Sequence, residues 1–369
     1  MTDYLRYRDD LETIQPDEQQ TIQQIIDVML QGQREVQATS GRSVRISHAK
    51  SHGVVVGELI IHAGLMPELR QGLFAQAGSH PVVVRLSQVP GEVLDDRKVS
   101  SPRGMALKVF NVAGPKLAGH DGQTTQDFVL ENGKPFFAKD PKAFLAKFAP
   151  NAKVAPLLPE SVKGAVSVAS RAANAALGAV GLKSEMLDIF GHPHLHPLGE
   201  SYYSQAAIRY GDYVAKIGIV PASETVRALA GKDVKIEDEN ALRGAVVDFF
   251  QSQEARYHVM VQLAVDPEKT PIEDATIPWP EELSPYQSVA TLVLPAQDAN
   301  ESSLQQMVDE TWSFAPGHAL AAHRPLGSIM RARLAVYPVV STSRRQENGS
   351  ALIEPQTCPE RREVMRTAE

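Results

Sequence analysis

The chain has 369 residues, of which 43% are hydrophobic, enough to bury the core of one large domain or two. Its formal net charge of −7 and scattered lysines and arginines give no electrostatic reason to bind nucleic acid or an anionic membrane. The single cysteine, Cys358, excludes an internal disulfide, and no apolar stretch is long enough to span a bilayer. Because the N-terminus is also unlike a secretory signal, we expect a globular, cytoplasmic protein.

Residues 1–40 predict a helical arm. The apolar residues Ile22, Ile25, Ile26 and Met29 follow helical spacing, but they are too few to form a core of their own. The arm is therefore expected to pack on the main body or on another subunit, which is compatible with a homo-oligomer.

Strand patterns dominate the next hundred residues. Residues 45–50 (RISHAK) and 82–87 (VVVRLS) are each predicted to form a strand. In the second of these, Arg85 and Ser87 are two residues apart, so their side chains share one face. The pattern continues through 101–110 (SPRGMALKVF) and 127–132 (DFVLEN).

The second half of the chain begins with residues 159–182, which are rich in alanine, serine and valine and predict a helix that faces the protein. A surface connector is expected at 271–285, where prolines and glutamates gather. The remaining strands are predicted at residues 204–209, 213–220, 255–265 and 288–294. About eight strands with few helices between them suit a closed antiparallel barrel.

Near the C-terminal end, Arg333 and Tyr337 are i and i+4 neighbours on a predicted helix, so their side chains can meet. A tyrosine becomes an anion at neutral pH only beside a fixed cation or a metal. A phenolate paired with a guanidinium is the chemistry of a tyrosinate ligand to ferric heme. Arg344, about three helical turns after Arg333, can reach a heme propionate if the helix continues past Pro338.

In this order, the segments resemble the heme catalase family, whose members carry R-x-x-H-A, V-R-F-S, D-P-R-G-F-A-V-K-F, N-N-x-P-x-F-F and R-L-F-x-Y-P with an arginine seven residues past the tyrosine. This chain has a counterpart of each of these motifs, in the same order, over about residues 42–344. The resemblance implies an α+β fold built on an antiparallel eight-stranded β-barrel with flanking helices, and heme b (iron protoporphyrin IX) as cofactor.

Because only about 25 residues follow Arg344, the chain is identified as a short, catalase-related peroxidase that lacks the C-terminal flavodoxin-like domain of large catalases. A site for bound NADPH is not expected. The predicted organisation is a helical arm (1–40), a heme-binding catalase-like domain (41–350) and a C-terminal tail (351–369).

The resemblance also implies three catalytic roles. His48 corresponds to the distal base, which takes a proton from one oxygen of a peroxide and returns it to the other. Ser87 would bond to the second imidazole nitrogen and fix the tautomer. Asn132 corresponds to an amide that bonds to the peroxide. Taken alone, each is an ordinary core, strand or turn residue.

Seven residues would hold the heme if the resemblance extends to the cofactor. Tyr337 is the implied axial ligand of the iron, and Arg333 is its charge partner. Phe137 would line the distal pocket, and Phe144 would stack on the porphyrin. The implied partners of the two propionates are Arg45, Arg85 and Arg344.

Two departures from the family pattern limit the expected activity. Ser47 stands where a valine is usual, and the segment 132–137 is one residue short. We therefore expect a peroxidase that reduces hydrogen peroxide or organic hydroperoxides with a small organic electron donor, with at most weak catalase activity. The hydroxyl of Ser47 leaves open a lipid hydroperoxide isomerase resembling allene oxide synthases. A heme-binding protein with idle iron is the other alternative.

Three alternating histidines, His192, His194 and His196, suggest a metal site, since alternate residues of a strand project together. Flanking prolines argue against a regular strand, and no carboxylate or cysteine clearly completes a ligand set. The sequence favours a loop without a metal.

Overall fold

The structure is a computed structural model that describes residues 3–182 and 184–361. Within these residues nine strands form one antiparallel sheet, and eight of them close into a barrel because β5 pairs with both β4 and β7. The strands are β1 (Ser51–Ile61), β2 (Gly78–Gln88), β3 (Arg103–Val109), β4 (Gln126–Asn132), β5 (Tyr202–Tyr203), β6 (Ile208–Tyr210), β7 (Tyr213–Pro221), β8 (Ala255–Leu263) and β9 (Gln287–Leu294). The predicted fold class is confirmed.

Side-chain alternation separates the inside of the barrel from its outside. Leu107 of β3 and the β4 residues Phe128 and Leu130 point into the main core cluster. On the opposite face of the same two strands, Lys108 and Asp127 are paired in register and form an ion pair at 2.8 Å. The odd-numbered residues of β4 therefore face outward.

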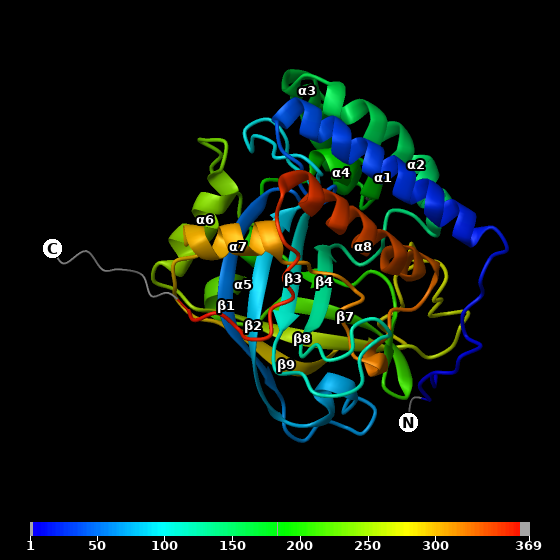
Figure 1. The fold of residues 1–369 in the computed structure, drawn as a ribbon. Coiled ribbons are helices and arrows are strands. Elements are labelled where there is room, and N and C mark those ends of the chain that lie inside the picture. The colour runs from blue at the N-terminus through cyan, green and yellow to red at the C-terminus, as the bar shows by residue number, and fades with distance from the viewer. Residues whose placement is uncertain (1–2, 183, 362–369) are drawn as a thin grey trace.

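Helices cover the outside of the barrel. They are α1 (Glu18–Ser40), α2 (Pro141–Val154), α3 (Glu160–Ala179), α4 (Glu185–Gly191), α5 (Glu224–Arg227), α6 (Ala241–Phe250), α7 (Ser302–Thr311) and α8 (Ser328–Asn348). Figure 1 shows α7 (orange) beside β1, and α8 (red) lying with α1 and α2. Ile25 and Ile26 of α1 meet Val336 of α8 and Phe144 of α2 in a separate apolar cluster. None of the described helices is long and apolar enough to cross a membrane.

The arm and the tail of the predicted organisation both contact the main body. Leu5 of the arm donates its N–H to Ala264, and α1 packs on α2 and α8 of the same chain. In the tail, Glu354 pairs with Lys108 at 2.7 Å, and Cys358 contacts the apolar cluster between the barrel and α7. The domain boundaries themselves stay a prediction.

Three local predictions were wrong. Residues 45–50 are irregular, because the N–H groups of His48 and Ala49 bond to Val89 and Pro90 instead of a strand ladder. The strand predicted at 204–209 is broken at Gln205, whose φ of 60° is left-handed. Helix α3 forms as predicted, but it buries only small residues such as Gly164 and Ser167 and leaves Val168 57% exposed.

Candidate active site

His48 is held over the outer face of β3. Its backbone is left-handed, with a φ of 59°, and its Nδ1 lies 3.1 Å from Oγ of Ser87 on β2. The ring rests on Gly104 of β3, where a Cβ atom would approach both Cε1 and Nδ1 of His48 to 2.5 Å. Only glycine leaves room for the imidazole here. The structure thus brings together His48 and Ser87, as the sequence predicted.

Burial and positive charge keep His48 neutral. Burial, followed by the charges of Arg85, Arg333 and Arg45, lowers the pKa of His48 to about 3. A neutral imidazole can accept a proton, as a distal base must. Because Arg333 belongs to α8, its effect also shows that this helix and the His48 loop share one electrostatic environment.

Three arginines meet at the C-terminal end of α7. Arg45 and Arg85 both bond to Oδ1 of Asp309, at 3.1 and 2.7 Å. Arg45 also donates to the carbonyls of Val308 and Trp312, and Arg344 donates to the carbonyl of Asp309. The carbonyl end of a helix attracts cations, which explains why they gather here.

The charge of this arginine cluster is suited to bind the two propionate carboxylates of heme. Burial and the charge of Arg85 hold the pKa of Arg45 well below its usual range. Burial also lowers the pKa of Arg344. Arginines outnumber the nearby carboxylates of Asp309 and Glu310, since Arg45, Arg85, Arg344 and Arg345 gather here, so the cluster carries excess positive charge that two propionates would balance. Sequence reasoning missed Asp309, which looks like any acidic residue of an amphipathic helix.

Tyr337 and Arg333 meet as the helical spacing predicted. Nη2 of Arg333 donates to Oη of Tyr337 at 2.9 Å, and the guanidinium carbon lies 5.3 Å from the centre of the tyrosine ring. Helix α8 continues past Pro338 to Asn348 and thereby carries the buried Arg344 to α7. A partly exposed phenol that accepts a hydrogen bond from a guanidinium has the chemistry of a ligand for ferric iron.

The two predicted phenylalanines belong to one aromatic group. The rings of Phe137 and Phe144 are 5.5 Å apart, and Phe144 stacks on Phe148 at 5.0 Å. Phe144 also touches the apolar cluster that holds Val336, the neighbour of Tyr337. These rings supply the apolar surface that a porphyrin needs close to its ligand.

Asn132 lies apart from the other predicted catalytic residues. Its Oδ1 accepts the N–H of Arg103 at 2.7 Å, and its Nδ2 donates to Oε1 of Glu200 at 2.9 Å. As an even-numbered residue of β4 it lies on the same face of the strand as Phe128 and Leu130, which face the core. Both ends of its amide are therefore engaged by the protein, and its contact with peroxide stays a prediction.

The three alternating histidines do not converge. His192 lies between Asp188, at 2.9 Å, and Glu200, at 2.7 Å. Burial lowers its pKa, but these hydrogen bonds outweigh burial and raise the pKa overall. His194 bonds to Arg171, and His196 accepts the N–H of Leu198. Among residues 3–182 and 184–361, no cluster of histidine, cysteine and carboxylate side chains has the geometry of a metal site.

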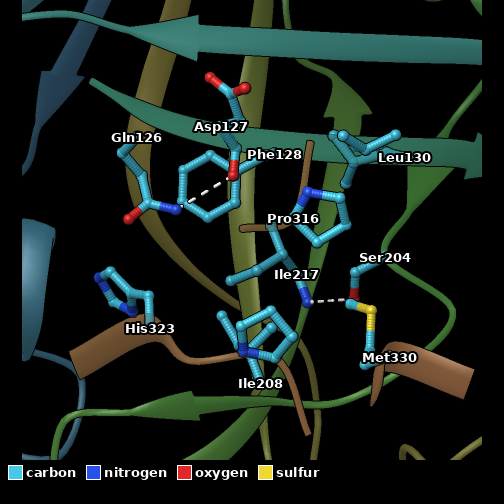
Figure 2. A pocket seen from close by; sticks show the side chains of 12 residues that line it. Gln126, Asp127, Phe128, Leu130, Ser204, Ile208, Ile217, Pro316, His323 and Met330 are labelled. Carbon is cyan, nitrogen blue, oxygen red and sulfur yellow. Dashed lines mark hydrogen bonds between the residues drawn. The ribbon is translucent and has the colours of Figure 1, made fainter. Parts of the chain in front are cut away.

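An internal cavity exists elsewhere in the barrel. Figure 2 shows it between Phe128 and Leu130 of β4, Ile217 of β7, and His323 and Met330. Its volume of about 30 Å³ is enough for one water molecule. It is too small to be the substrate site.

Comparison with known proteins supports the catalase-like fold. No protein-family model and no curated protein sequence matches the chain. Among solved structures, the chain is similar to a fungal catalase, with a TM-score of 0.58 and 19% identity over 83% of this chain and 60% of that one. Similarity to catalase A from Saccharomyces cerevisiae is equivalent, with a TM-score of 0.58 and 18% identity over 82% and 61%. The chain thus spans about 60% of the length of these neighbours. At this identity the fold is shared, and the fold class is that of the catalases.

Proposed function

We propose that the protein is a heme-dependent peroxidase that reduces hydrogen peroxide or organic hydroperoxides with a small organic electron donor, and that it disproportionates hydrogen peroxide weakly. The observation that carries this proposal is that His48, bonded to Ser87 and seated over Gly104, shares its electrostatic environment with the Arg333–Tyr337 pair. This combination suits chemistry on a ligated iron.

Bound heme b would supply an iron atom that binds peroxide and two electrons that cleave its O–O bond. Tyr337 would hold the iron through its phenol oxygen, which accepts the 2.9 Å hydrogen bond from Arg333. Arg45, Arg85 and Arg344 would bind the propionates. Neutral His48, oriented by Ser87, would take a proton from one peroxide oxygen and return it to the other.

The removal of one phenol tests this proposal. The parent protein, supplied with heme, is expected to absorb near about 400 nm and to change spectrum with stoichiometric peroxide. Tyr337→Phe should lose the phenolate spectrum and most peroxide turnover, because the ring cannot ligate iron. Tyr7→Phe removes a hydroxyl that bonds to Asp9 and should behave as the parent. A Tyr337→Phe variant with the parent's spectrum and turnover contradicts the proposal.

Two further experiments separate the alternative functions. A lipid hydroperoxide isomerase would form rearranged lipid without consuming a donor. The hydroxyl of Ser47 donates to the carbonyl of Val89 at 3.0 Å, so its proton is already engaged. An idle heme protein would lose no peroxide reactivity in a His48→Ala variant, whereas the proposed peroxidase would lose most of it.

A further inference from the structure

A second glycine on the outer face of the barrel supports an aromatic ring. The residues on either side of Gly218 in β7 point into the core cluster, so Gly218 itself faces outward. A Cβ atom on Gly218 would lie 3.1 Å from the ring of Tyr203 and 3.2 Å from that of Tyr286. Tyr203 therefore packs on the outside of the barrel, as His48 packs on Gly104.

Strand pairing places Tyr203 close to His48. Gly104 of β3 pairs with Glu131 of β4, and Glu131 pairs in turn with Tyr203 of β5. Neighbouring strands are about 4.8 Å apart, so about 10 Å separate Tyr203 from the glycine on which His48 rests. The two side chains share the outer face, and an electron has only a short distance to cross between Tyr203 and a heme bound at His48.

A lysine lies over both tyrosine rings. Nζ of Lys134 is 5.6 Å from the ring centre of Tyr203 and 5.9 Å from that of Tyr286, and the two ring centres are 5.6 Å apart. Lys134 also pairs with Glu281, and both of these side chains are partly exposed. Gln205, whose φ of 60° is left-handed, donates to the carbonyls on either side of Lys134 at 3.3 and 3.0 Å. This strained residue fixes the group at the surface.

The hydroxyl groups of this pair differ from those of the core tyrosines. The phenols of the buried Tyr202 and Tyr257 donate to backbone carbonyls at 2.7 and 2.8 Å. Within residues 3–182 and 184–361, the hydroxyls of the half-buried Tyr203 and Tyr286 make no hydrogen bond to the protein. They can therefore exchange protons with water or with a bound molecule without breaking a contact of the fold.

We propose that Tyr203 is the residue at which the protein oxidises its organic donor, and that this donor is a small phenol bound against Tyr203 and Tyr286. The inference rests on the proposed function and names its donor class. A phenol suits the site because its ring can pack on the two aromatic rings while its hydroxyl meets the hydroxyl of Tyr203. The donor then needs no access to the iron.

The transfer is balanced in electrons and protons. Tyr203 loses one electron to the peroxide-oxidised heme protein and its phenol proton to water. The tyrosyl radical then takes a hydrogen atom from the donor, so the O–H bond of the donor breaks and that of Tyr203 forms again. Two such cycles return the two electrons that reduced the peroxide. The two protons released are those that the peroxide takes up as it becomes water, or water and an alcohol.

The substitution Tyr203→Phe keeps the ring on Gly218 and removes the phenol. With hydroquinone as the donor, we expect the rate constant for its oxidation by the peroxide-treated protein to fall by about tenfold or more. The preceding reaction with peroxide should change little, because it takes place at His48. Electron paramagnetic resonance gives a second readout: without a donor, the parent should form a tyrosyl radical, and Tyr203→Phe should lose most of this signal.

Two further variants are compared with Tyr203→Phe. Tyr7→Phe is the matched control, because Tyr7 is also half-buried and lies beneath a cation, Arg209, at 4.3 Å. It should retain the parent's radical signal and rate constants. Tyr286→Phe should slow hydroquinone oxidation less than Tyr203→Phe does. The reverse order would assign the role to Tyr286 and overturn the inference.

The inference and the proposed function can fail separately. A parent protein that does not react with peroxide refutes the proposed function. A reactive parent whose Tyr203→Phe variant keeps the radical signal and the rate of hydroquinone oxidation refutes the inference alone. If this variant does not take up heme, the parent decides the question. After peroxide and a nitroso spin trap, peptide mass spectrometry should find the trap on Tyr203, and trap found only on other residues would overturn the role.

Discussion

At the scale of single residues, the site depends on Gly104, which has no side chain. The imidazole of His48 packs directly on the backbone of Gly104, and the left-handed backbone of His48 directs the ring there. Ser87 then fixes the ring from one side through the 3.1 Å contact with Nδ1. The position of the base is therefore set by β2 and β3, although the histidine itself lies in an irregular segment.

Gly104→Ala tests this support. The new methyl group would lie 2.5 Å from two atoms of His48, so the ring must move. A displacement of about 1 Å costs on the order of 10²-fold in rate, and we expect a loss of this size in the reaction with peroxide, with heme still bound. Gly78→Ala, where the added Cβ has no neighbour within 4 Å, is the matched control. Equal rates of reaction with peroxide for the two variants would show that Gly104 does not position His48.

At the scale of secondary structure, the end of α7 organises the arginines. Its terminal carbonyls and the side chain of Asp309 together bind Arg45, Arg85 and Arg344, which come from a loop, β2 and α8. These elements are distant in the sequence, so this helix end connects both sides of the site.

Asp309→Asn is expected to act mainly on the heme-free protein. The substitution leaves Arg45 and Arg85 without their charged partner, which should lower the free energy of unfolding by roughly 3 kcal/mol. Heme propionates would replace the missing charge, so the heme-loaded variant should lose less. Urea unfolding of both forms measures the difference.

Glu254→Gln is the control for this experiment, because Glu254 pairs with the exposed Arg256 outside the arginine cluster and surface pairs contribute about 0–1 kcal/mol. An equal loss of stability with and without heme in Asp309→Asn would contradict a propionate role for the arginine cluster.

At the scale of the whole molecule, the closed barrel and its helices bury several histidines in the neutral form. Burial lowers the pKa of His194, His196 and His323 to about 4, and of His48 to about 3. The unfolded chain protonates the same side chains near about pH 6.5. Only His192, among those with a resolved shift in the described residues, has a raised pKa.

The protein should therefore be sensitive to mild acid. Between about pH 6.5 and 4.5 the unfolded chain binds protons that the folded chain does not, so the free energy of unfolding should fall as the pH falls, by about 2 kcal/mol or more. Urea titrations across this range measure the slope. A free energy of unfolding that stays level or rises toward acid would contradict neutral burial of these histidines.

Much of the site could be predicted from the sequence because it depends on local spacing. Arg333 and Tyr337 meet because residues four apart adjoin on any helix, and Arg85 and Ser87 share a face because residues two apart do so on any strand. The closed barrel was expected from the resemblance to catalases, whereas the alternating patterns missed β1 and β5 and placed a strand at 45–50 that does not form.

The remaining features were decided by tertiary structure alone. A shift of one residue along a strand exchanges the inner and outer faces, so only the pairing of β3 with β4 shows that Asn132 lies on the face of Phe128 and Leu130 and not on the face of His48. Asp309 became part of the site only when three distant arginines reached the same helix end. Spacing within one segment fixes neighbours on that segment, whereas contacts between segments depend on strand register and helix placement, which the sequence does not state.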